Sequence, residues 1–358
     1  MSRKFKCCFL AIFCCSLLML TACTPKKYII TPSTTEIGTT GNTADHTDHT
    51  ATGTTESTVH EPSDETAQGK SGAVWYALGD SITEGWTSAK DPTAETGYSQ
   101  FLNKNEAQRW VNIVAEKNGY DLTNHGIGGT GYMRCKENTM NARQLADTLD
   151  FAQCHFVTLA YGVNDWKYAV NIGTAEDIPQ TLFAAYDGHK ELKLAENTPA
   201  YITVYKNGTL LEEGKDYVVG NGYLTLMEDS EKGDILDIYN AEESMVTNMS
   251  YVIKKILRDN PLCKIFVITP INCKSVGSYG TNWGIYYAGD ATNGLGLEDI
   301  FALQKAVCDY YGIELIDMTH SSVVNRENIR SLLVDSVHPT VEGHEALARE
   351  LAEKISFY

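Results

Sequence analysis

The sequence predicts a three-layer α/β/α sandwich on a parallel sheet, with a small antiparallel β module inserted into it. From Val74 onward, short apolar runs alternate with amphipathic segments, a pattern typical of parallel strands covered by helices on both faces. Between positions 187 and 243 the pattern changes to alternating strands separated by turn residues, as in antiparallel hairpins. We therefore expect an α/β domain formed by 71–186 and 244–358, interrupted by a β module at 187–243.

The elements before the insertion are predicted from apolar runs and from the residues that end them. The run from Val74 to Leu78 ends at Gly79, as a buried parallel strand does before a turn. Apolar residues recur on one face of 109–118, and Gly119 is placed to end that helix. The predicted strands of this half are 74–78, 122–124 and 155–160.

The insertion and the elements after it follow from the same signals. In the insertion, strands are predicted at 201–205, 217–219, 223–226 and 235–239, and Asn207-Gly208 marks a hairpin turn. Beyond it, periodicity predicts a helix from Ser244 to Asp259 that Asn260-Pro261 ends. The remaining predictions are strands at 264–269 and 314–317 and helices at 300–311 and 341–356.

The first 70 residues are predicted to be a leader and a linker. A basic start precedes an apolar run from Cys7 to Leu20 that is too short to span a membrane. The run closes with Leu20-Thr21-Ala22-Cys23, which resembles a bacterial lipobox, so we expect a signal peptide at 1–22 and a lipid on Cys23. An ordinary signal peptide or anchor helix is the alternative. Positions 23–70 are polar and predict a disordered linker.

Composition limits the partners of the chain. The net charge is −17, and removal of 1–22 would take away three basic residues and no acid, giving −17 − 3 = −20. Such acidity argues against nucleic acid and against direct binding to anionic membranes, so only the lipidated Cys23 would contact the membrane. Five cysteines lie beyond Cys23, without CxxC spacing, and predict buried thiols rather than a disulfide framework or zinc site.

Four short motifs together indicate acyl transfer. They are Gly79-Asp80-Ser81, the glycine-rich stretch 124–129, Gly162-Val163-Asn164-Asp165 and Asp335-Ser336-Val337-His338. Their order and content resemble the SGNH or GDSL family of esterases and lipases. The resemblance implies that family's flavodoxin-like α/β sandwich, with the motifs at the carboxyl ends of the strands, where ligands bind in open α/β sheets.

The resemblance also implies roles for individual residues. Ser81 is expected to be the nucleophile and His338 its general base, with Asp335 orienting the imidazole. The oxyanion donors are expected to be the Ser81 and Gly129 backbone N–H groups and the Asn164 amide. Gly128 lies beside Gly129, which leaves the choice of backbone donor open at this stage. His344 is expected to be structural, and no metal or organic cofactor is implied.

Aromatic residues near the motifs are candidates for contact with the substrate: Trp86, Tyr132, Trp166 and Trp283. Aromatic side chains are also ordinary packing residues, so each of them has this alternative. Two interpretations of the insertion also stay open, because it is either a tolerated surface insertion or a substrate-binding or lid module.

The expected activity is a Ser-His-Asp ester hydrolysis through an acyl-enzyme. An extracytoplasmic location, in the membrane of a bacterium as a lipoprotein, favours deacetylation of carbohydrate, with an acylated small molecule or polysaccharide as substrate. A lipase, lysophospholipase or thioesterase with the same site is the first alternative. A surface glycan-binding protein with a vestigial hydrolase site is the second.

Overall fold

The computed structural model describes residues 72–135, 139–273, 296–325 and 327–356. The predicted signal peptide, Cys23 and the linker lie outside the described residues, as does Trp283. Within the described ranges, no helix has the length and apolar character needed to cross a bilayer.

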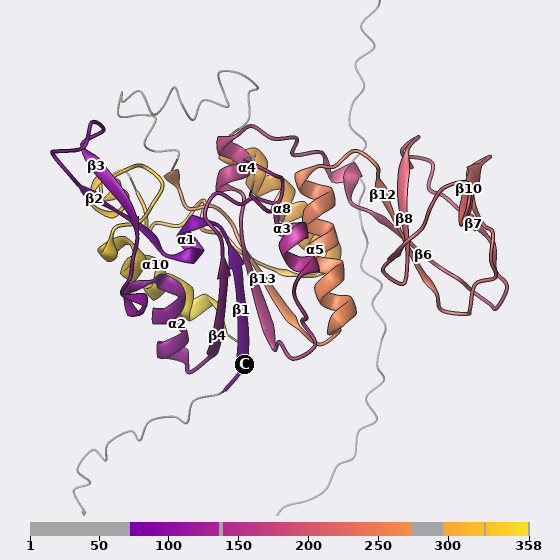
Figure 1. Ribbon diagram of the computed structural model, residues 1–358, viewed down its shortest axis with the longest axis horizontal. Helices are drawn as coiled ribbons and strands as arrows, with labels where there is room; N and C mark the ends of the chain where they lie inside the picture. Colours follow the sequence, from indigo (N-terminus) through magenta and orange to yellow (C-terminus); the bar gives the residue numbers. More distant parts are fainter. Residues whose placement is uncertain (1–71, 136–138, 274–295, 326, 357–358) are drawn as a thin grey trace, which may run out of the picture. The chain divides into compact units, whose positions relative to one another are not determined.

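A parallel sheet of five strands forms the centre of the α/β domain (Figure 1). The strands are β1 (Val74–Gly79), β4 (Asp121–Gly126), β5 (Phe156–Ala160), β13 (Lys264–Ile268) and β14 (Glu314–Ile316). Their order is β14-β13-β5-β1-β4, and each neighbouring pair is parallel. The chain leaves β1 toward one edge and leaves β5 toward the other, so a topological switch point lies beside β1, where ligands bind in open α/β sheets.

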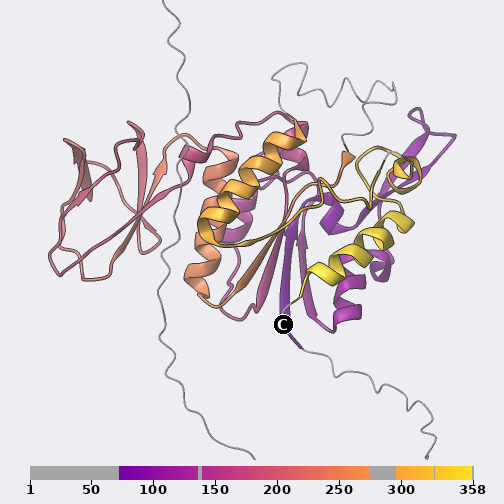
Figure 2. The same cartoon turned by 180° about the vertical axis from the view of Figure 1, so that it is seen from behind.

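Helices cover the sheet on both sides (Figures 1 and 2). On one side α2 (Trp110–Asn118) packs against α10 (Val341–Lys354). On the other, α5 (Met245–Asp259) packs against both α3 (Ala142–Asp147) and α8 (Leu297–Tyr311). Trp75 of β1 has no exposed surface and stacks on Phe156 of β5 at 5.6 Å between ring centroids. The predicted three-layer α/β/α fold is therefore confirmed.

Several shorter elements complete this domain, and some differ from the prediction. They are α1 (Ser81–Glu84), η1 (Glu106–Gln108), α4 (Val163–Lys167), η2 (Ala175–Asp177) and α9 (Ile329–Leu332). A hairpin of β2 (Trp86–Lys90) and β3 (Tyr98–Leu102) was not predicted. The buried side chains of β2 are the polar Thr87 and Ser88, so the hairpin lacks the apolar alternation that marks a strand.

The insertion is antiparallel, as predicted, but begins earlier in the chain. Its strands are β6 (Gln180–Phe183), β7 (Glu191–Lys193), β8 (Ile202–Lys206), β9 (Thr209–Leu210), β10 (Tyr217–Gly220), β11 (Tyr223–Leu226) and β12 (Ile235–Asn240). They form two sheets, ordered β6-β12-β8-β9 and β10-β11-β7, around a separate apolar cluster. Because β6 pairs with β12, the module starts at Gln180 rather than at the predicted 187.

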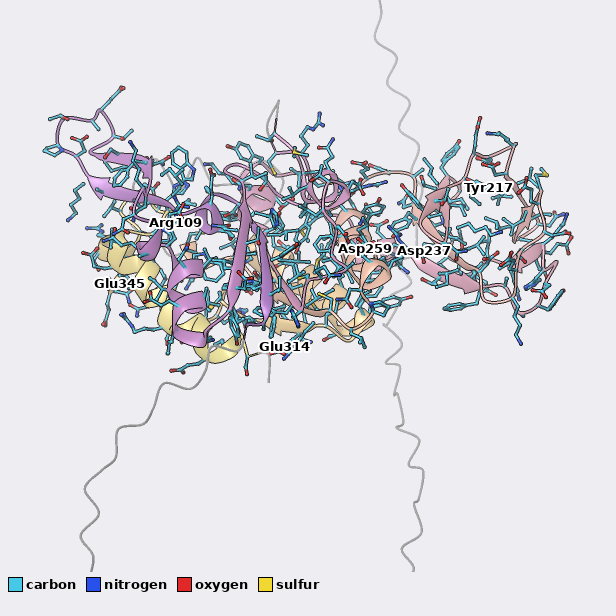
Figure 3. All side chains as sticks on the ribbon, turned by 60° about the horizontal axis from the view of Figure 1, so that its bottom comes forward. Arg109, Tyr217, Asp237, Asp259, Glu314 and Glu345 are labelled. Atoms are coloured by element: carbon cyan, nitrogen blue, oxygen red, sulfur yellow. The ribbon has the colours of Figure 1, made fainter. Side chains whose placement is uncertain are left out.

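The insertion is joined to α5 by polar and aromatic contacts. Lys254 of α5 donates to Asp237 of β12 at 2.7 Å, and both side chains are largely buried. Tyr205, Tyr239 and Tyr251 pack together at the same junction. Figure 3 labels Asp237 at this junction and Tyr217 in the second sheet of the module. Arg143 of α3 also donates to the Tyr205 hydroxyl, so the module has its own core and is attached to two helices of the α/β domain, α5 and α3.

Candidate active site

Ser81 lies at the carboxyl end of β1, as the first residue of α1. The helix is capped by Asp80, whose side chain accepts the Ile82 backbone N–H at 2.9 Å. Asp80, and not Ser81, is therefore the capping residue of α1. Since the carboxylate of Asp80 provides the cap, the hydroxyl of Ser81 remains available to another partner.

That partner is His338, which lies 257 positions away in the loop before α10. Its Nε2 atom is 2.9 Å from Ser81 Oγ, and its Nδ1 atom is 2.6 Å from Asp335 Oδ2. The predicted nucleophile, base and orienting carboxylate therefore form one continuous chain of hydrogen bonds. Burial raises the pKa of Asp335, but hydrogen bonds and charge from His338 and two backbone N–H groups outweigh it and hold the pKa below its usual value.

The loop that carries this pair is shaped by the carboxylate itself. Asp335 Oδ1 accepts the backbone N–H groups of Val337 at 3.0 Å and His338 at 2.7 Å. Ser336, which lies between Asp335 and Val337, has a φ of +80°, an unfavourable conformation for a residue with a side chain. This Asx-type turn fixes Asp335 Oδ1 on the backbone and directs Oδ2 toward the imidazole.

The glycine-rich loop after β4 lies beside Ser81. A Cβ atom added to Gly128 would be 3.7 Å from the Cβ of Ser81. The Gly128 N–H donates to Glu84 Oε2 at 2.6 Å, so this amide is already engaged. Gly129 follows with a φ of +81°, which glycine adopts without strain. Of the two glycine amides that the sequence left open, that of Gly128 is the one with a hydrogen-bond partner among the described residues.

Asn164 is in the first turn of α4, after β5, and is buried. Its side-chain Nδ2 donates to Thr130 O at 2.8 Å, which uses one amide hydrogen and leaves the other. The next residue, Asp165, accepts the backbone N–H groups of Tyr132 at 3.1 Å and Met133 at 2.8 Å. The GVND motif therefore holds the loop that contains Gly129 in a fixed position.

Two carboxyl groups are buried below this site. Burial is the largest cause that raises the pKa of Asp80, to about 7, and the nearby Asp165 raises it further, against hydrogen bonding from Ile82 and the charge of His338. Burial also raises the pKa of Asp165, to about 6. Both groups therefore hold their protons to higher pH in the folded protein than in the unfolded chain.

This difference predicts a pH-dependent stability. Between about pH 4 and pH 7 the folded protein binds the Asp80 proton that the unfolded chain has lost, so the free energy of unfolding falls as pH rises. The Asp80 contribution amounts to about 4 kcal/mol over the window. We expect the Asp80→Asn protein, which keeps an oxygen to cap α1, to lack this part of the fall in the free energy of unfolding. Urea unfolding of both proteins from pH 4.5 to 8 measures it, and parallel stability curves would contradict it.

The aromatic candidates are distributed differently from the prediction. Tyr132 has no exposed surface and packs against Tyr161, so its prediction as a substrate contact is wrong. Trp166 is only 6% exposed and belongs to the core, which also argues against contact with the substrate. Trp86 is half-buried beside the site, with its ring centroid 6.5 Å from that of His338. Its Nε1 atom donates to Glu84 at 2.9 Å.

His344 is buried in α10, as a structural histidine should be. Its Nδ1 accepts the Trp110 N–H and its Nε2 donates to Trp86 O at 3.0 Å, which is the pattern of a neutral ring. Burial lowers the pKa of His344 to about 4.

Two further residues of the site, Glu84 and Gln100, were not predicted. Glu84 lies three residues after Ser81, but nothing in the sequence shows that its carboxylate reaches Gly128.

The protein is thus an α/β sandwich in which Ser81, at the carboxyl end of β1, contacts His338 and Asp335 from the loop before α10. The chain belongs to the GDSL-like lipase/acylhydrolase family, whose model matches residues 77–346, most of the chain. Membership supports ester hydrolysis as the kind of reaction.

The chain is also similar to solved structures at low identity. An aryl esterase from M. smegmatis is 14% identical, with a TM-score of 0.44 over 79% of this chain and 98% of the other. A family two carbohydrate esterase from Clostridium thermocellum is 13% identical, with a TM-score of 0.41 over 79% and 63%. A member of the lipolytic G-D-S-L family from Veillonella parvula is 12% identical, with a TM-score of 0.40 over 79% and 98%. No curated protein matches the sequence.

Proposed function

We propose that the protein is a serine esterase that works through an acyl-enzyme. The observation that carries this proposal is the continuous contact from Ser81 Oγ through His338 to Asp335. Ser81 attacks the ester carbonyl while His338 Nε2 takes its proton, and His338 then returns the proton to the leaving alcohol. Water, activated by the same nitrogen, attacks the acyl-enzyme and releases the acid. Asp335 holds the tautomer with Nδ1–H and stabilises the imidazolium.

The charge that develops on the carbonyl oxygen needs donors that are already in place. In this proposal they are the Ser81 N–H, the Gly129 N–H and the second amide hydrogen of Asn164. The N–H groups in the first turn of a helix have no partner within the helix, which applies to Ser81 in α1. Removal of one such donor costs about 2.7–4 kcal/mol of transition-state stabilisation. The engagement of Gly128 by Glu84 supports Gly129 as the second donor.

For the substrate, the proposal is an acetylated carbohydrate outside the cytoplasm. The predicted leader and the predicted lipid on Cys23 support an extracytoplasmic location, and the polar composition of 23–70 supports a domain held away from the membrane. The insertion adds exposed aromatic side chains, with Tyr186 at 59%, Tyr201 at 80% and Tyr223 at 40% exposure. Such rings offer flat apolar faces with a polar tip, which suits the surface of a sugar.

Acetate release from a panel of acetylated glycans, including xylan and peptidoglycan, tests this proposal, with Ser81→Ala as the control. We expect acetate release from at least one glycan and faster hydrolysis of p-nitrophenyl acetate than of long-chain esters. A preference for long-chain esters would favour the lipase or lysophospholipase alternative. If neither short-chain nor long-chain esters are hydrolysed, the glycan-binding alternative with a vestigial site replaces the esterase.

The exposed tyrosines of the insertion allow a separate prediction. We expect replacement of Tyr186, Tyr201 and Tyr223 by Ala to lower the rate on an acetylated polysaccharide at least several-fold and to leave p-nitrophenyl acetate hydrolysis unchanged. These side chains lie outside the cluster that packs the module, so the fold should be retained. Initial rates on both substrates measure the effect. Equal losses on the two substrates, or none, would show that the module is only a tolerated insertion.

A further inference from the structure

The β2–β3 hairpin is bonded to the loop that carries His338. Ser88 donates its backbone N–H to Pro339 O at 3.1 Å and its hydroxyl to His338 O at 2.7 Å. Thr87 donates its hydroxyl to the same Pro339 carbonyl at 2.7 Å. Ser88 pairs with Gln100 across the hairpin, which places their side chains on one face. The face that holds the His338 loop therefore also presents Gln100.

Gln100 reaches the carboxylate that orients the base. Its Nε2 donates to Asp335 Oδ2 at 2.6 Å, and the same oxygen contacts His338 Nδ1 at 2.6 Å. Asp335 is 1% exposed, and its other oxygen is used by two backbone N–H groups. Of the four donors that the structure gives this carboxylate, Gln100 is the one that comes from an element outside the His338 loop.

We infer that Gln100 is a positioning residue for the Ser81–His338–Asp335 site, and this inference rests on the proposed esterase function. The amide holds Oδ2 in line with Nδ1 and takes up part of its negative charge. As a neutral donor it restrains the carboxylate without adding a charge of its own. It therefore influences both the alignment of His338 and the charge available to stabilise its protonated ring.

Other titratable groups also face this pair. The phenol of Tyr98, on the same hairpin, interacts with the charge of Asp335. Asp80 at the start of α1 and His344 of α10 interact with the charge of His338. These groups stay in place when Gln100 is changed, so a shift of the pH profile in a Gln100 variant reports on the amide itself.

The test compares Gln100→Met and Gln100→Glu with a matched control, Ser99→Ala. Met has the length of Gln without the donor, and Glu adds a negative charge beside Asp335. Ser99 is on the same strand and pairs with Ala89, so its side chain is on the opposite face. We expect Gln100→Met to lower kcat for p-nitrophenyl acetate about tenfold with little change in KM, as for loss of a hydrogen bond to a charged group.

The pH profile separates positioning from simple structural support. Without the Gln100 amide, more negative charge remains on Asp335, and this charge favours the protonated form of His338. The acidic limb of the kcat/KM profile should therefore move to higher pH in Gln100→Met and further in Gln100→Glu. Ser99→Ala should match wild type in rate and profile. A Gln100→Met protein with wild-type kcat, or with an unshifted limb, would overturn the inference.

Ser81→Ala, measured alongside, distinguishes a failure of the proposed function from a failure of the inference about Gln100. If Ser81→Ala is as active as wild type, the proposed function fails. If Ser81→Ala is inactive while Gln100→Met behaves as wild type, the esterase proposal stands and only the role of Gln100 is rejected. Gln100 is exposed, and thermal unfolding of each variant shows whether the fold is retained.

Discussion

Ser81→Ala should lower kcat for short-chain ester hydrolysis by about 10⁴–10⁶-fold, down to the level that binding and the oxyanion donors alone can support. The reason is chemical, because no acyl-enzyme can form without the hydroxyl that lies 2.9 Å from His338. The fold should be preserved, since Asp80 rather than Ser81 caps α1. Initial rates on p-nitrophenyl acetate measure the loss.

His338→Ala provides the comparison for Ser81→Ala. The two residues act as one unit, so the double variant should be no slower than either single variant. Additive losses would mean that they act independently, which would contradict the mechanism. His320→Ala is the matched control, because His320 is also held by an aspartate three positions earlier but is exposed. Its removal should leave the rate unchanged.

Asp335→Asn should lower kcat by about 10⁴-fold, the cost of presenting the wrong tautomer of the base. The geometry fixes how the new amide would lie. The backbone N–H groups of Val337 and His338 require an oxygen at the position of Oδ1, so the NH₂ group takes the position of Oδ2. Gln100, which donates to Oδ2 in the wild type, then has to turn its side-chain oxygen toward the new NH₂ group. The NH₂ group also donates to His338 Nδ1, which forces the proton onto Nε2 and removes the acceptor that Ser81 needs.

The chain contains a matched control for this variant as well. Asp317 contacts His320 Nδ1 at 2.8 Å with the same three-residue spacing, but at an exposed position. Asp317→Asn should therefore keep wild-type kcat. Steady-state rates at several pH values measure both variants. An Asp335→Asn protein that retains a tenth or more of wild-type kcat would contradict the orienting role of Asp335.

Most of the fold could be predicted from the sequence because its signals are local. The apolar runs at 74–78 and 155–160 became central strands, and Gly119 ends α2 in the left-handed conformation. The helix at 300–311 begins earlier, at Leu297, because Glu298 and Asp299 are acidic first-turn residues rather than part of the apolar pattern. The family assignment was also confirmed, since four motifs in fixed order carry more information than any one of them.

The parts that could not be predicted depend on contacts between distant residues. The β2–β3 hairpin is held by polar bonds to the His338 loop, and hydrophobic periodicity does not record such bonds. Glu84 and Gln100 were missed for the same reason, since each acts on a group from another motif. Tyr132 was misjudged because proximity to a motif in sequence does not show on which side of the loop a ring packs. The lipid on Cys23 stays a prediction.

The most direct test of the central claim is covalent labelling by a fluorophosphonate, which reacts with an activated serine. We predict that the protein takes up one equivalent, that peptide mass spectrometry places it on Ser81, and that esterase activity is lost in proportion. Labelling should be absent in Ser81→Ala and much slower in His338→Ala. Activity that is lost by labelling of another residue, or that persists after Ser81 is fully labelled, would contradict Ser81 as the nucleophile.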